Sequence, residues 1–295
     1  MNSAASVRAR LLNLSKQTGE DFQALLTRYA IERFLYRLGV SDQSGEFILK
    51  GAMLFVAWEG NLHRPTKDLD LLGFGDPSPG AVAERIRAVV SLPSDDGILF
   101  DPASIEAAAI REDAEYEGVR VKLSASLEQA RIRLQVDIGF GDVVDPAPAR
   151  TAYPAILSHV QPPTLRMYPP ETVIAEKLQA MVVLDIRNSR MKDFYDLWYL
   201  SRNWPFQLAV LRRAVFATFE RRRTEVPTGL PFALTEEFLT DEGKRQQWVA
   251  FVRRLNLAAD TPDLRALGQE IARFVQPVFA AGEQDATWQP GGSWQ

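Results

Sequence analysis

The chain has 295 residues, a formal net charge of −4, 46% hydrophobic residues and 24% charged residues, a composition typical of a folded protein with one large domain or two smaller ones. It contains 0 cysteines and 2 histidines, which excludes disulfides, thiol catalysis and cysteine-based zinc sites. The negative net charge gives no general attraction to nucleic acid, so binding to RNA or DNA would require a local basic patch.

Residues 5–40 are predicted to form a pair of helices. Apolar side chains recur at helical spacing from Phe22 to Leu38, and Gly39 is a suitable C-cap. The N-terminal segment lacks the hydrophobic centre of a signal peptide, and no later stretch is long and apolar enough for a membrane helix. We therefore expect a cytoplasmic protein that does not enter a membrane.

The next part of the chain is expected to alternate between short helices and strands. A helix is expected from about Lys50, because good helix formers follow it, and a strand is expected over 64–74, where glycines end it. Residues 80–91 have the pattern of an amphipathic helix. Alternating apolar side chains predict two further strands, over 116–128 and 130–142.

A Pro-rich stretch over 145–170 separates this part from a second half that is mostly helical. Pro170 is suited to a helix start and Glu171 to its first turn, where the helix dipole favours an acid. The last residues are polar and contain several glycines and a proline, which favours fraying. The expected parts are a core lobe over 1–160, a helical lobe over 161–282 and a flexible tail over 283–295.

Two aspartates, Asp68 and Asp70, interrupt an otherwise apolar predicted strand. Residues i and i+2 of a strand face the same side, so both carboxylates would project together while the neighbouring leucines point into the core. Burying an unpaired carboxylate is costly, so these side chains are either exposed at a strand end or bound to a cation. An Asp-x-Asp pair alone is weak evidence, and exposure is then the more common explanation.

A third carboxylate, Asp137, lies on the polar face of the predicted strand over 130–142, together with Arg133 and Gln135. Three carboxylates on adjacent strands are what a two-metal phosphoryl-transfer site needs. Oxygen ligands of this kind favour magnesium or manganese. The alternative is that Asp137 faces solvent or pairs with an arginine.

Further polar residues could serve the same chemistry. A glycine at a turn into a helix, as in Lys50-Gly51, lets backbone N–H groups approach a phosphate. Lys177 borders an apolar helical stripe and could either stabilise phosphate charge or form an ordinary ion pair. Asp193 and Asp196 are i,i+3 neighbours that could bind a ribose or act as a base, although Asp196 could equally pair with the lysine one turn before it.

A run of arginines occurs in the sequence LRRAVFATFERRR. A solvated helix face is the default interpretation of such a run, and contact with an RNA backbone is the more specific one. The arginines of this run are Arg212, Arg213, Arg221, Arg222 and Arg223.

Taken in order, these stretches resemble the AbiEii/AbiGii-type nucleotidyltransferase toxin family, the toxin half of abortive-infection toxin–antitoxin pairs. The resemblance covers about residues 5–205 and is carried by FILKGAMLF, RPTKDLDLL, VDIGFGD, YPPETVIAEKLQAM and RMKDFYDLWYL. It implies an α+β fold, with a DNA polymerase β-like nucleotidyltransferase core on a mixed sheet and a largely helical C-terminal lobe.

The resemblance implies roles for residues of a catalytic site. Asp68 and Asp70 match the family's metal-binding pair, and Asp137 matches its third carboxylate. Lys177 matches the lysine expected at the nucleotide phosphates, and Asp196 matches the last acidic motif. The implied catalytic set is Asp68, Asp70, Asp137, Lys177 and Asp196, with Mg²⁺ or Mn²⁺ held by the first three.

The resemblance also implies nucleotide-binding residues. Lys50 and Gly51 match the family's Lys-Gly-Gly turn beside the phosphates, and Ala52 replaces the second glycine, a departure that could stiffen the turn. Arg64 and Thr66 match an Arg-x-Thr element. The implied nucleotide-binding set is Lys50, Gly51, Arg64, Thr66, Lys177 and Asp193.

The implied activity is transfer of a nucleoside monophosphate from a nucleoside triphosphate to an acceptor, with release of pyrophosphate. An RNA acceptor, the 3′ end of tRNA, would give a toxin that blocks translation and that a separately encoded antitoxin neutralises. One alternative is a small-molecule acceptor such as an antibiotic, and another is a silent nucleotide-binding module. Polymerase β-like cores serve RNA, proteins and antibiotics alike, so the fold does not choose between these acceptors.

Overall fold

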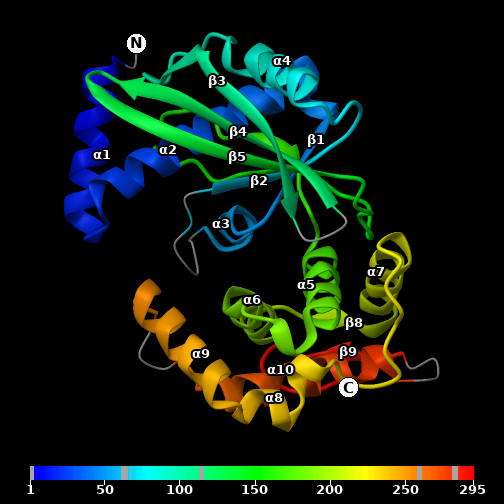
Figure 1. The fold of residues 1–295 in the computed structure, drawn as a ribbon. Coiled ribbons are helices and arrows are strands. Elements are labelled where there is room, and N and C mark those ends of the chain that lie inside the picture. Colours follow the sequence, from blue (N-terminus) through cyan, green and yellow to red (C-terminus); the bar gives the residue numbers. More distant parts are fainter. Residues whose placement is uncertain (1–2, 61–65, 67, 113–115, 258–260, 281–284) are drawn as a thin grey trace. The chain divides into compact units, whose positions relative to one another are not determined.

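The computed structural model divides the chain into two compact units, each drawn in Figure 1. The first unit comprises Met1–Gly141 and Pro148–Tyr168, and the second comprises Asp142–Ala147 and Pro169–Gln295. The residues described are 3–60, 66, 68–112, 116–257, 261–280 and 285–295.

The first unit is built on a mixed sheet. Within the described residues this sheet has five strands in the order β1-β2-β5-β4-β3. The strands β2 and β5 run parallel, and the other neighbouring pairs run antiparallel. The bounds are β1 (Phe47–Lys50), β2 (Asp68–Gly73), β3 (Leu99–Glu112), β4 (Tyr116–Leu127) and β5 (Ala130–Phe140). The predicted mixed sheet is confirmed.

Helices cover one face of this sheet because alternate strand residues are apolar. Leu69 and Leu71 of β2, and Val136 and Ile138 of β5, are at most 1% exposed and form the covered face. The helix α2 packs against β5, and α4 packs against β3. The helices of the unit are α1 (Ala4–Thr18), α2 (Phe22–Val40), α3 (Met53–Glu59), α4 (Pro79–Val90) and the short η1 (Asp42–Gly45).

Two local expectations about this unit are wrong. Gly39 does not cap α2 but lies inside it, and a Cβ there would be 2.5 Å from the carbonyl oxygen of Thr164, so the glycine permits close packing of two backbones. The helix expected from Lys50 begins instead at Met53, because Lys50 ends β1 and a turn at Gly51 separates the two elements.

The first unit extends beyond residue 160, where the sequence predicts the lobe boundary. Tyr153, Leu157 and Val160 are buried, and the paired strands β6 (Arg150–Ala152) and β7 (Thr164–Arg166) flank this segment. The backbone then runs beside β1, where the N–H of Tyr168 donates to the Leu49 carbonyl at 3.0 Å. The Pro-rich stretch is therefore largely part of the first unit and not a linker.

The second unit is largely helical, as predicted. Its apolar helix faces meet in a core that includes Leu178, Phe194, Phe219, Phe238 and Phe274, each fully buried. The elements are α5 (Pro170–Leu184), η2 (Asp185–Arg187), α6 (Met191–Asn203), β8 (Phe206–Gln207), α7 (Leu208–Arg221), η3 (Phe232–Leu234), α8 (Glu236–Thr240), α9 (Glu242–Leu255), α10 (Leu264–Phe279) and β9 (Thr287–Trp288).

The segment that the sequence predicts as a flexible tail contains the strand β9. The strand β9 pairs with β8, and Trp288 is 4% exposed, with its indole N–H donating to the Ser201 carbonyl at 2.6 Å. The ring of Trp294 stacks on Phe274 at a centroid distance of 5.9 Å. Burial of two large aromatic side chains outweighs the polar composition of the residues around them.

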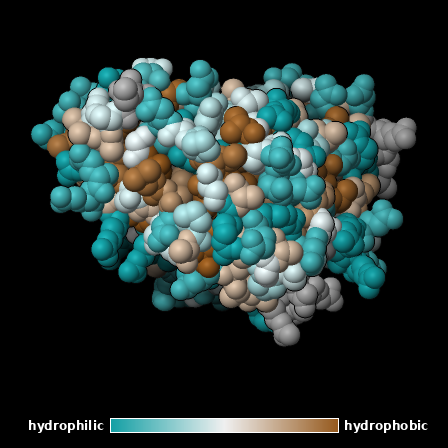
Figure 2. All heavy atoms as spheres, turned by 90° about the horizontal axis from the view of Figure 1, so that it is seen from above, coloured by the Kyte–Doolittle hydropathy of each residue, from teal (hydrophilic) through white to brown (hydrophobic). Residues whose placement is uncertain are grey.

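None of the described helices is long and apolar enough to cross a membrane. On the face shown in Figure 2, hydrophilic residues predominate and the apolar ones lie in small separate groups.

Candidate functional site

Strands β2 and β5 bring the predicted carboxylates of the first unit onto one face of the sheet. Asp70 pairs in parallel register with Asp137, and Asp68 pairs with Gln135. Side chains of directly paired residues project from the same face, which here is opposite the face that the helices cover. Asp68 is exposed and Asp70 half-buried, whereas Asp137 is only 8% exposed.

The two opposed carboxylates are the centre of a row of four charged residues that crosses four strands. Lys50 of β1 pairs with Asp70, and Arg120 of β4 pairs with Asp137. We call Lys50, Asp70, Asp137 and Arg120 the charge row. Like charges directly opposite each other destabilise a sheet, and here a cationic residue stands at each end of the row.

Asp137 is held by its own neighbours. The Arg120 Nε donates to Oδ1 at 2.8 Å and its Nη2 donates to Oδ2 at 2.7 Å. The side-chain amide of Gln135 also donates to Oδ2, at 3.3 Å. Of the alternatives considered for Asp137, the structure therefore shows pairing with an arginine. Across the described part of the chain, no three His, Cys, Asp or Glu side chains converge as a metal cage would require.

Gly51 gives Asp70 the space it occupies. Gly51 has φ +75°, and a Cβ built on it would lie 2.0 Å from Oδ2 of Asp70, so neither the conformation nor the space suits another residue. Ala52 follows with helical dihedrals of φ −66° and ψ −22°, so the departure from the family's second glycine introduces no strain. The ammonium group of Lys50 lies 5.5 Å from the ring centroid of Tyr168.

The Arg-x-Thr element is described only in part. Thr66 donates its hydroxyl to the backbone carbonyl of Asp68 at 3.3 Å, so it supports the start of β2. Arg64 lies outside the described residues.

The second unit holds Lys177 against two buried carboxylates. Its Nζ lies 2.8 Å from Oδ1 of Asp193 and 2.8 Å from Oδ2 of Asp196, and both aspartate side chains are 1% exposed. Lys177 projects from α5 and the aspartates from successive turns of α6, so packing of these two helices makes the cluster. The sequence suggested the lysine one turn before Asp196 as a partner, and the structure shows an ion pair between Asp196 and Lys177.

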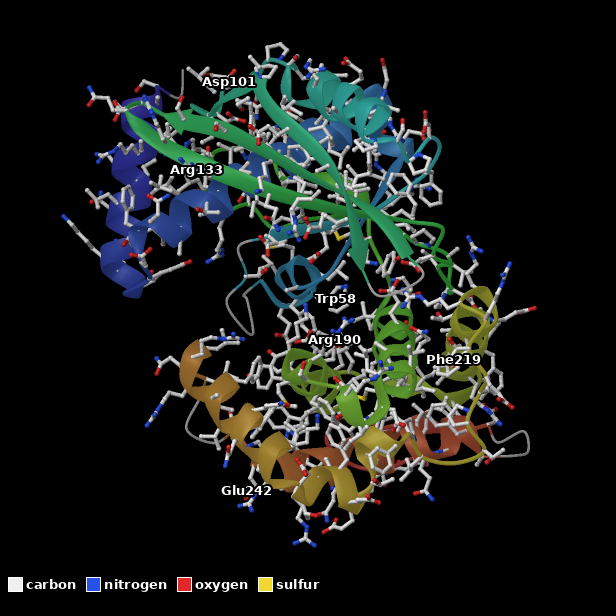
Figure 3. All side chains as sticks on the ribbon, in the orientation of Figure 1. Trp58, Asp101, Arg133, Arg190, Phe219 and Glu242 are labelled. Carbon is white, nitrogen blue, oxygen red and sulfur yellow. The ribbon has the colours of Figure 1, made fainter. Side chains whose placement is uncertain are left out.

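Arg190 belongs to the same cluster and was missed in the sequence. It lies immediately before α6 (Figure 3), and its Nε is 2.6 Å from Oδ2 of Asp193. Burial alone would raise the pKa of Asp193, but the charges of Lys177 and Arg190 outweigh burial and hold this pKa below its ordinary value of 3.8. The i,i+3 spacing of Arg190 and Asp193 was the available signal.

The arginine run does not act as one exposed patch. Arg222 is 14% exposed and pairs with Asp142 at 2.8 Å, and it also donates to the side chain of Gln179. Arg213 pairs with Asp145, and Arg212 donates to the carbonyl of residue 280. Arg221 and Arg223 are exposed at the end of α7.

Comparison with protein families matches residues 33–270 to the family described as nucleotidyl transferase AbiEii toxin, type IV toxin–antitoxin system. The match covers most of the chain. The chain belongs to the AbiEii toxin family. This AbiEii protein is therefore a nucleotidyltransferase of a toxin–antitoxin system, and its family implies an antitoxin partner.

Solved structures agree with the fold of this AbiEii protein. JHP933 from Helicobacter pylori is 16% identical, with a TM-score of 0.51 over 87% of this chain and 92% of that chain. A second H. pylori structure, described as that of a candidate nucleotidyltransferase, is 16% identical, with a TM-score of 0.52 over 88% of this chain and 96% of that chain. Comparison with curated proteins gave no significant match.

Proposed function

We propose that this AbiEii protein is a metal-dependent enzyme that transfers a nucleoside monophosphate from a nucleoside triphosphate to an RNA acceptor. The proposed acceptor is the 3′ end of tRNA in the cytoplasm, where the modification would block translation until a separately encoded antitoxin limits it. The observation that carries the proposal is the parallel pairing of Asp70 with Asp137, with Asp68 on the same face.

The donor set of the first unit suits a hard divalent cation. Asp68 and Asp70 offer carboxylate oxygens two residues apart on one face, and the Gly51 turn leaves Asp70 its space. When bound there, magnesium or manganese supplies neutralisation of the phosphate charge and activation of the acceptor hydroxyl. Asp137 completes the set only after it exchanges its contact with Arg120.

The chain's own residues would bind the nucleotide. In the first unit, the backbone after Lys50 turns at a glycine and can approach a phosphate closely. In the second unit, Asp193 and Asp196 favour the charged form of Lys177, which is the form that stabilises phosphate charge. Arg190 shares the charge of Asp193, so the aspartate pair does not fully neutralise Lys177.

An RNA acceptor is supported by the toxin family and by the two exposed arginines at the end of α7. Arg221 and Arg223 are exposed, and backbone phosphates are the usual partners of such residues. The internal pairing of Arg213 and Arg222 makes this surface smaller than the sequence suggested.

The test is transfer of label from each of the four α-labelled nucleoside triphosphates, with magnesium, to purified tRNA. We expect label in tRNA with one nucleotide, and loss of about 100-fold or more in Asp70→Asn, because a bound metal contributes several kcal/mol to such a transition state. Asp101→Asn, on β3 of the same sheet (Figure 3), is the matched control and should keep full activity.

Three outcomes contradict parts of the proposal. Equal activity of a folded Asp70→Asn protein would refute the assigned site. Label that reaches a small hydroxyl compound but not tRNA would refute the RNA acceptor. Nucleotide binding without transfer to tRNA or to a small hydroxyl compound would refute the proposed transfer reaction.

A further inference from the structure

The charge row places two carboxylates opposite each other. Asp70 and Asp137 face each other in register on β2 and β5, on the side of the sheet away from the helices. Two neighbouring carboxylates repel each other, and the repulsion is strong where solvent access is low, as it is for Asp137 at 8% exposed. A cation beside Asp137 therefore offsets part of this repulsion.

Arg120 supplies that cation with fork geometry. Its Nε and Nη2 donate separately to the two carboxylate oxygens of Asp137, at 2.8 and 2.7 Å. Two parallel, charge-assisted hydrogen bonds are the strongest form of this contact. The amide of Gln135 also donates to Oδ2 at 3.3 Å, so each oxygen of Asp137 accepts at least one hydrogen bond.

The pair is asymmetric in its burial. The side chain of Asp137 is 10% exposed, whereas that of Arg120 is 39% exposed. Arg120 can therefore move into solvent at modest cost, while the carboxylate stays where the strand register holds it. The carboxylate is the fixed group, and the guanidinium is the exchangeable one.

We propose that Arg120 is a built-in counter-cation that occupies Asp137 when the site is empty of metal and competes with the divalent cation for this carboxylate. The inference rests on the metal site of the proposed function. The guanidinium N–H groups take up lone pairs of both carboxylate oxygens, so Asp137 has to give up part of this contact to bind a cation fully. Arg120 is thus a positioning residue that sets the metal concentration at which Asp137 joins the site.

The test is a titration of the protein with Mn²⁺ in the absence of nucleotide. Binding is measured by calorimetry and by the electron paramagnetic resonance signal of free Mn²⁺. We expect Arg120→Gln to bind manganese about fivefold more tightly, which corresponds to about 1 kcal/mol and to the loss of one partly exposed ion pair. Arg120→Lys, which keeps the charge but loses the fork, should lie between the wild type and Arg120→Gln.

The matched control is Lys122→Gln. Lys122 is exposed, lies two residues along β4 on the same face, and pairs in register with Gln135, so this variant removes the same charge without touching Asp137. We expect a change of less than about twofold. In an Asp137→Asn background, Arg120→Gln should have no effect on manganese affinity, because the competition acts through Asp137.

The outcomes separate this inference from the metal site itself. Binding that is lost in Asp70→Asn but unchanged or weaker in Arg120→Gln overturns the role of Arg120 alone. The role of Arg120 is also overturned if Lys122→Gln raises manganese affinity equally, or if Arg120→Gln still raises it in the Asp137→Asn background. Either result would show that the affinity depends on net charge and not on the contact with Asp137. Binding that Asp70→Asn leaves unchanged overturns the metal site, and the inference with it.

Discussion

Lys177 is a residue for which the sequence leaves two roles open, stabilising phosphate charge or forming an ordinary ion pair. The structure places its ammonium group between the buried carboxylates of Asp193 and Asp196. One residue therefore has two tasks, because the group proposed to bind phosphate also compensates two charges in the interior of the second unit.

Replacing this lysine should lower stability as well as activity. In Lys177→Met the buried Asp196 loses its charge partner, and Asp193 keeps Arg190. Breaking a buried ion pair by removing one partner costs several kcal/mol, and we expect a loss of about 3 kcal/mol in the free energy of unfolding at pH 7. Urea denaturation measures it, and Lys192→Met, which replaces an exposed lysine of α6, is the matched control with an expected change below about 0.5 kcal/mol.

The stability difference should depend on pH in a defined direction. Because the pKa of Asp193 in the folded protein lies below its ordinary value of 3.8, its contribution is fully present above pH 3.8 and is lost as the pH falls below it. The difference between wild type and Lys177→Met should therefore shrink below pH 3.8. A difference that stays constant from pH 7 to pH 3 would contradict the assignment of Lys177 as the main partner of Asp193.

At the scale of elements, the C-terminal strand shows how a few aromatic side chains override local composition. Residues around β9 are polar, and a glycine pair follows them. Trp288 and Trp294 nevertheless contact each other and Phe274 of α10, with the Trp288 ring 4.9 Å from the Phe274 ring. Gly39 is likewise explained by a contact between residues far apart in the chain. It lies inside α2, where the backbone of β7 approaches too closely for a side chain.

Trp288 should therefore contribute strongly to the stability of the second unit. We expect Trp288→Ala to lower the free energy of unfolding by about 3 kcal/mol, because it leaves a cavity among Phe206, Phe274 and Trp294. Trp288→Phe keeps a ring but loses the hydrogen bond to Ser201, so about 1 kcal/mol is expected. A frayed tail would instead give no change in thermal or urea unfolding for either variant.

At the scale of the whole molecule, charge limits how this protein can meet an RNA. The net charge of −4 gives no long-range attraction, so any RNA contact depends on local cations. Arg213 and Arg222 are engaged within the second unit, and Arg221 and Arg223 are exposed. Arg221 and Arg223 are therefore the residues that we expect to exchange solvent counterions for phosphates.

The double variant Arg221→Gln/Arg223→Gln should weaken tRNA binding and reduce its salt dependence. Each lost phosphate contact is expected to lower the slope of log K against log salt by about 0.7 to 0.9. Arg253→Gln/Arg254→Gln, on the exposed face of α9, makes the same change in net charge and is the matched control. Equal losses in both variants, or an unchanged slope in the first, would contradict a local phosphate contact at the end of α7.

The sequence by itself determined the features that depend on local order. Alternation of apolar residues predicted β4 and β5, and an apolar stretch ended by glycines predicted β2. The i,i+2 spacing of Asp68 and Asp70 fixed their common face, since side-chain direction in a strand follows from position alone. Helical spacing predicted α2, and the order of motifs indicated the family to which the chain belongs.

Tertiary structure decided which of these groups meet. The pairing of Asp137 with Arg120 depends on the register of two antiparallel strands, and the burial of Asp196 against Lys177 depends on the packing of α5 on α6. The need for glycine at position 51 follows from an approach of Asp70 that comes from the neighbouring strand. Contacts of this kind join residues far apart in the chain, so their energies are set by packing and register and leave no local pattern in a single sequence.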